Sequence, residues 1–106
     1  MIKVTVTHRS SSIDSITIKG HAGFAEEGRD LICAAISAIG YGLMNAIDEM
    51  EPESCDIIDE ENKIIINVNH DSVKLQNILS TALIMIKTVE EGYPRFVSIK
   101  NMEVKQ

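Results

Sequence analysis

The segment from Gly20 to Ser37 carries the side chains of this sequence that are best suited to chemistry. Asp30 precedes a long apolar run and is a favourable helix N-cap, so the next three residues, ending at Cys33, are expected to form the first helical turn. Backbone N–H groups there lack intrahelical partners and carry partial positive charge, which favours a thiolate. His21 lies upstream across a loop, so this segment offers a nucleophile and a candidate base.

Several roles for these side chains stay open on the residues alone. A cysteine in an apolar helix is most often a small hydrophobic residue, and an activated one could also be a redox sensor. His21, Cys33 and Asp30 could hold zinc, although their spacing is not that of a compact zinc motif. Asp30 could cap the helix or orient His21 as the third member of a triad. Ser37 could hydrogen-bond within the site or to its own helix backbone.

The residues between the candidate base and nucleophile predict an irregular loop. We expect this loop to become ordered when a substrate binds, with its glycines as natural hinges. Free N–H groups at the helix start, those of Cys33 and Ala34, are candidates for binding an oxyanion. Cys55 falls in a predicted strand and is expected to fill the core. The predicted substrate loop contains Ala22, Gly23, Glu26, Glu27 and Gly28.

Composition limits the classes of function. The chain has 106 residues, 44% of them hydrophobic, and a formal net charge of −6. These values predict one globular domain, favour a basic protein partner, and make nucleic acid an unexpected ligand because no basic patch stands out. We expect no membrane segment, because no signal-peptide layout is evident and no apolar run reaches about 18 residues. Free thiols and a cytoplasmic location are therefore expected.

Alternating apolar and polar residues predict five strands in the order ββαββαβ. The first hairpin turns through a polar segment, and the second turns at an acidic one. Two hairpins indicate a two-layer α+β fold, with a mainly antiparallel five-stranded sheet and two helices on one face, spanning 1–106 as a single domain. The predicted strands are Met1 to His8, Ser15 to Gly20, Ser54 to Asp59, Lys63 to His70 and Phe96 to Val104.

The two predicted helices differ in pattern. The first, from about Asp30 to Met50, is apolar on almost every side, and Gly40 and Gly42 lower its helix propensity. We interpret both features as a homodimer contact through this helix. The second begins after Asp71 or Ser72, ends near Glu91 and has a single buried stripe. Its stripe comprises Leu75, Ile78, Leu79, Ala82, Ile86 and Val89.

The motif residues resemble the signature of the ribosomal-processing cysteine proteases. The match consists of Gly20-His21-Ala22, then Gly28, then the run from Asp30 to Ser37 that reads DLICAAIS. Element order and chain length also match, so the resemblance covers the whole domain. No motif position departs from the family pattern.

The resemblance implies a dimeric cytosolic cysteine endopeptidase that uses no metal and no cofactor. Its implied substrate is the precursor of large-subunit ribosomal protein twenty-seven, cut after a Phe that ends a short N-terminal extension. Carried over by position, Cys33 is the nucleophile and His21 the base, while Asp30 and Ser37 take the two further polar motif positions. A non-catalytic ribosome-assembly binder and a thiol redox sensor are the alternatives.

Overall fold

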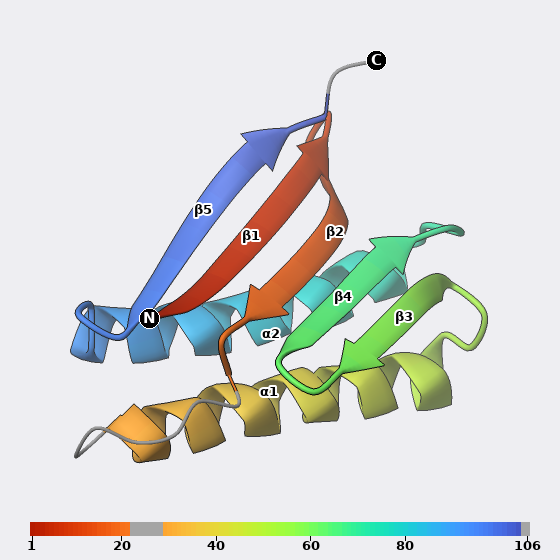
Figure 1. The fold of residues 1–106 in the computed structure, drawn as a ribbon. Helices are drawn as coiled ribbons and strands as arrows, with labels where there is room; N and C mark the ends of the chain where they lie inside the picture. Colours follow the sequence, from red (N-terminus) through yellow and green to blue (C-terminus); the bar gives the residue numbers. More distant parts are fainter. Residues whose placement is uncertain (22–28, 105–106) are drawn as a thin grey trace.

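A computed structural model describes residues 1–21 and 29–104 and contains the predicted element order, ββαββαβ (Figure 1). The element boundaries lie within a few residues of those that the sequence pattern predicts. The strands are β1 (Ile2–Arg9), β2 (Ser12–Lys19), β3 (Cys55–Glu60), β4 (Lys63–Val68) and β5 (Val97–Glu103), and the helices are α1 (Arg29–Met50) and α2 (Val73–Gly92).

The five strands form one sheet in the order β3-β4-β2-β1-β5. The pairs β1–β2, β2–β4 and β3–β4 are antiparallel, whereas β5 pairs with β1 in parallel. Helix α2 carries the chain back along the sheet after β4, so β5 runs in the same direction as β4 and β1. Such a crossover connection is what parallel strands require. The predicted two-layer α+β fold is confirmed, with a mixed sheet that is mostly antiparallel.

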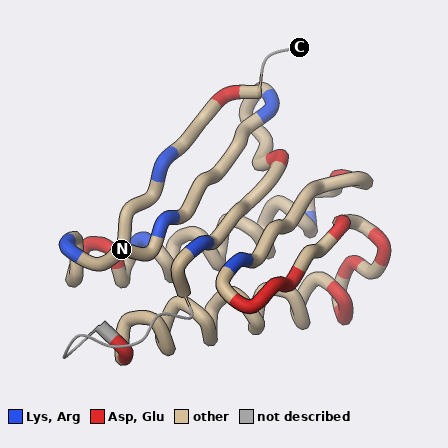
Figure 2. The backbone as a smooth tube through the Cα atoms, in the orientation of Figure 1, with Lys and Arg blue, Asp and Glu red and all other residues tan. Residues whose placement is uncertain are grey.

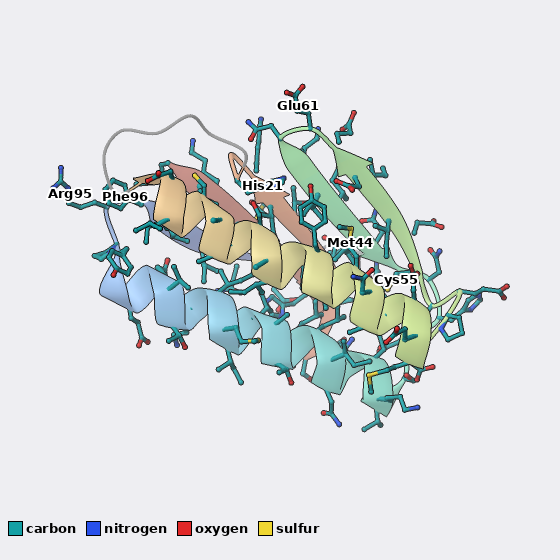
Figure 3. All side chains as sticks on the ribbon, turned by 90° about the horizontal axis from the view of Figure 1, so that it is seen from below. His21, Met44, Cys55, Glu61, Arg95 and Phe96 are labelled. Carbon is teal, nitrogen blue, oxygen red and sulfur yellow. The ribbon has the colours of Figure 1, made fainter. Side chains whose placement is uncertain are left out.

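The core lies between the sheet and the two helices, which cover the same face of the sheet (Figures 1 and 3). Alternate strand residues point into it, as a half-buried strand demands. The opposite face of the sheet is not covered by either helix. Fully buried strand residues are Ile2, Val4, Val6, Ile16, Ile18, Ile64, Ile66 and Val97.

Helix α1 is long and apolar enough by length and composition to cross a membrane, from Asp30 to Met50. The uncharged run within it, between Asp30 and Asp48, is shorter than the roughly 18 residues of a membrane span. The fold gives the apolar residues another role, because Ile32, Ile36 and Ile47 are buried in the core between helix and sheet.

Helix α2 follows its predicted pattern closely. The Ser72 hydroxyl caps it by accepting from the N–H of Leu75 at 3.0 Å. Leu75, Leu79, Ala82 and Ile86 are buried, while Ile78 and Val89 of the predicted stripe are partly buried.

The two glycines of α1 face different surroundings. A Cβ on Gly40 would lie 2.9 Å from Cδ1 of Ile64 and 3.4 Å from Cδ1 of Ile18. Gly40 therefore lets β2 and β4 approach the helix closely, and its interpretation as a dimer contact was wrong. A Cβ on Gly42 would meet nothing within 4 Å, so of the two glycines only Gly42 remains a predicted dimer contact.

Candidate active site

The chain leaves β2 through a tight turn that requires glycine. Gly20 has a φ of 91°, which residues with a Cβ rarely adopt. A Cβ there would also lie 2.9 Å from the carbonyl oxygen of Met1. The Gly20 N–H donates to the Asn62 carbonyl at 3.0 Å, so the turn is anchored to the β3–β4 hairpin.

Helix α1 then contacts this turn through two side chains that are one helical turn apart. The Cys33 Sγ lies 3.9 Å from the Gly20 carbonyl oxygen, toward which the thiol donates. The Ser37 hydroxyl donates to the His21 carbonyl at 3.1 Å. Side chains at positions i and i+4 share a helix face, so the Asp-x-x-Cys-x-x-x-Ser spacing aligns both with the strand exit.

Ser37 also holds the imidazole of His21, whose Nδ1 lies 2.9 Å from the Ser37 Oγ. A serine hydroxyl has one proton, and here that proton is directed to the His21 carbonyl. The oxygen therefore accepts from Nδ1–H. This arrangement selects the tautomer with hydrogen on Nδ1 and leaves an unprotonated lone pair on Nε2.

The His21 Nε2 is buried and has no hydrogen-bond partner among the described residues. The whole side chain is 1% exposed, and the Tyr41 ring packs edge-on against it at 5.9 Å between centroids. Burial lowers the pKa of His21, and the opposing charge of Asp59 raises that pKa by a smaller amount. Because the effect of burial exceeds that of Asp59, the net shift favours a neutral imidazole, the form that accepts a proton.

Cys33 is 4% exposed and does not hydrogen-bond to His21 in this structure, because Nδ1 faces Ser37 and Nε2 has no partner. The structure thus brings both residues to one strand–helix junction without a thiol–imidazole hydrogen bond. Both side chains are buried, so truncating either one would also remove part of the packed interior. Figure 3 shows His21 beside α1.

Asp30 lies inside the first turn of α1, because the helix begins one residue earlier, at Arg29. The predicted N-cap position was therefore wrong. The Asp30 carboxylate is exposed and accepts from the N–H of Leu31 at 3.0 Å, while the His21 ring is held by Ser37.

The earlier helix start also changes the oxyanion site. In a helix beginning at Arg29, the N–H groups of Cys33 and Ala34 reach the carbonyls four residues back. The interpretation of these two groups as free donors was wrong, since they belong to the helical hydrogen-bond ladder.

The remaining predicted site residues divide into two groups. The substrate-loop residues Ala22, Gly23, Glu26, Glu27 and Gly28 lie outside the described residues. Within the described ranges, no three His, Cys, Asp or Glu side chains gather as metal ligands. Cys55 is half-buried against the core, as predicted, and burial raises the pKa of its thiol.

Sequence reasoning missed two side chains around the imidazole. Tyr41 lies one turn beyond Ser37 and two turns beyond Cys33, so the helical period could have identified it. Asp59 comes from β3, and no local pattern relates it to His21; only the strand order places its charge near the ring.

Comparisons with known proteins identify the family of this chain. Residues 1–98 match the model of the family described as cysteine protease Prp. The ribosomal processing cysteine protease Prp of Mycoplasma pneumoniae is 32% identical over 103 residues, covering 95% of each chain. The Staphylococcus aureus protein of that description is 34% identical over 97 residues, covering 88% of this chain and 92% of its own.

Solved structures show the same fold. The Staphylococcus aureus ribosomal processing protease Prp in complex with a substrate peptide has a TM-score of 0.88 at 28% identity, over 95% of this chain and 99% of that one. A Streptococcus mutans protein has a TM-score of 0.89 at 28% identity, over 98% and 96% of the two chains. The protein described here is therefore a member of the cysteine protease Prp family.

Proposed function

We propose that this chain is a cytoplasmic cysteine endopeptidase that removes the short N-terminal extension of large-subunit ribosomal protein twenty-seven, cutting after a Phe. Support comes from the family membership and from relatives described as ribosomal processing proteases, one of them in complex with a substrate peptide. The observation that carries the proposal is the buried, Ser37-held imidazole of His21 beside the helix turn that bears Cys33.

The proposed reaction uses the lone pair that Ser37 leaves on His21. The Cys33 thiol turns from the Gly20 carbonyl toward Nε2 and gives up its proton there, while Sγ bonds to the scissile carbonyl carbon. The protonated imidazole then donates that proton to the departing amine as the C–N bond breaks. A water molecule, deprotonated by the same nitrogen, attacks the thioester and releases the acid as the C–S bond breaks. The imidazolium returns its proton to the departing Cys33 thiolate, which restores the starting state.

We also propose that the active protein is a homodimer joined through the outward side of α1. On that side the helix has small or apolar residues, and Leu31 is 72% exposed. A groove of about 640 Å³ runs between α1 and α2, lined by Gly42, Leu43, Met50, Ile78 and Met85 among others. Light scattering should give twice the protomer mass, and Gly42→Leu should lower that mass by blocking close approach.

The function is tested by incubating the full extended precursor with wild type and with Cys33→Ala. Mass spectrometry should find a cut after the Phe with wild type alone. If both proteins bind the precursor and neither cuts it, the chain is an assembly binder. If peroxide modifies Cys33 while the precursor stays intact, the redox-sensor alternative replaces the protease.

A further inference from the structure

Three lysines stand side by side across the uncovered face of the sheet. Cross-strand register places Lys3 opposite Lys19, and Lys19 opposite Lys63. Their neighbours along each strand, Ile2, Ile18 and Ile64, are buried, so the lysines point away from the helices. Figure 2 shows blue segments following one another across β1, β2 and β4. We call these three residues the lysine row.

This arrangement costs stability. Like charges directly opposite one another on neighbouring strands are destabilising, and strands lie only about 4.8 Å apart. One acidic side chain relieves it, because Glu60 pairs with Lys63 at 3.7 Å at the edge of the row. Lys3 and Lys19 are exposed and form no ion pair that the described residues show. In a chain of net charge −6, grouping three of ten basic residues in this way calls for an anionic partner.

Beside the row, the outward-facing residues of β1, β2 and β5 are polar, whereas Ile65 of β4 and Ile58 of β3 make the adjoining surface apolar. The next outward-facing pair along β1 and β2 is Thr5 opposite Thr17, and Lys100 of β5 lies opposite Thr5. The row itself offers ammonium groups without arginine forks or aromatic rings. Lysine binds phosphate as a point charge, whereas arginine gives bidentate recognition of both carboxylate and phosphate, so a row of lysines suits charge neutralisation without fixed geometry.

We propose that the lysine row binds the phosphate backbone of RNA, independently of base sequence. A regular line of cations suits a polymer with one charge per nucleotide, and the threonine hydroxyls can hydrogen-bond to 2′-OH groups, which DNA lacks. This departs from the expectation that nucleic acid is no ligand. The row is scattered over residues 3, 19 and 63 of the sequence, and only strand pairing assembles it.

The row lies at the end of the sheet from which the candidate active site begins. Lys19 is the last residue of β2, and His21 follows two positions later. RNA bound on the outer face would therefore lie beside the strand exit without covering the imidazole, which lies on the helix side.

The test measures anisotropy of a fluorescein-labelled 20-nucleotide single-stranded RNA with wild type and with Lys3→Gln/Lys19→Gln/Lys63→Gln. We expect the substitutions to weaken binding at least ten-fold at 50 mM salt. The slope of log affinity against log salt should fall by about 2, since each phosphate contact on single strands contributes about 0.7. A matched control, Lys74→Gln/Lys87→Gln/Arg95→Gln, removes the same charge from exposed positions off the sheet and should lose less than three-fold.

Thermal melting separates binding from folding. The row variant should melt no lower than wild type, because it relieves repulsion between opposed lysines. Equal losses of RNA affinity in the two triple variants, or no RNA binding by wild type, would refute the lysine row as the site. Equal binding of DNA of the same sequence, or tighter binding of polyglutamate, would refute RNA as the partner.

Discussion

At the scale of single residues, Ser37 is the side chain that prepares the buried His21 for its proposed role as a base. It accepts from Nδ1–H and donates to the carbonyl of the same residue, which fixes both the ring and its tautomer. Neither Cys33 nor Asp30 hydrogen-bonds to the ring in this structure. In the proposed mechanism, the orienting role that a carboxylate has in a serine-protease triad belongs to the Ser37 hydroxyl, one turn from the proposed nucleophile.

Ser37→Ala should lower kcat about ten-fold or more while leaving KM nearly unchanged. Each lost 1.4 kcal/mol of transition-state stabilisation corresponds to a factor of ten, the order of one hydrogen bond. Ser98→Ala, on the exposed side of β5, is the control. Steady-state kinetics on a peptide spanning the cleavage site would check this, and an unchanged kcat would remove Ser37 from the mechanism.

In the proposed mechanism, the protonation of His21 sets the acid limit of activity. Burial lowers its pKa, so the imidazole stays neutral to lower pH than a free histidine. The acid limb of kcat/KM should therefore have an apparent pKa below 6.5. Asp59 opposes this shift, and Asp59→Asn should move the limb to still lower pH.

The control for this pH profile is Asp56→Asn, three residues earlier on the same edge strand. It removes an equal charge from a side chain pointing to the other face of the sheet, and should leave the limb in place. If the acid limb of kcat/KM moves to higher pH in Asp59→Asn, a group other than His21 controls the pH dependence.

At the scale of elements, α1 must lie close to the sheet for its Cys33 and Ser37 face to meet the exit from β2. Gly40 permits that approach, since a methyl group there would press on Ile64 and Ile18. Gly40→Ala should be less stable than Gly42→Ala by about 1–3 kcal/mol, the usual cost of overpacking. Replacing either glycine by alanine raises the helix propensity by the same amount, so this contribution cancels when the stabilities of the two variants are compared.

Urea unfolding of the two glycine variants at one protein concentration would measure the difference. Equal midpoints would mean that β2 and β4 can move aside, and that close packing at Gly40 does not set the position of the helix.

The sequence predicts the elements well because each has a strong local period. The alternation through Ile2, Val4 and Val6 identifies a strand, and Ser72 identifies the start of α2. Local pattern could not show that β5 pairs in parallel with β1, that Asp59 acts on His21, or that the lysines align. Those relations depend on strand order and register, which join residues far apart in the chain.

At the scale of the whole molecule, charge is unevenly distributed. Figure 2 shows acidic residues gathered along β3 and the nearby end of α1. The chain has 16 acidic and 10 basic side chains, and a ribosomal protein substrate would be strongly basic. Opposite charges accelerate encounter, and salt screens that gain over a Debye length of about 8 Å at physiological ionic strength.

We therefore expect kcat/KM for the full basic precursor to fall as salt rises from low to physiological concentration, with little change in kcat. A short neutral peptide with the same cleavage site should respond much less. Parallel kinetics at several salt concentrations would decide this, and identical profiles would show that charge does not steer the substrate.

The most direct test of the proposed mechanism is to find which atom becomes acylated. A single-turnover reaction with the extended precursor, stopped in acid and digested, should carry the extension through its Phe as a thioester on Cys33 in wild type. His21→Gln, which fills most of the buried space, should accumulate none. Acyl groups on Cys55, or full cleavage with neither cysteine ever acylated, would contradict the assignment of Cys33 as nucleophile and His21 as its base.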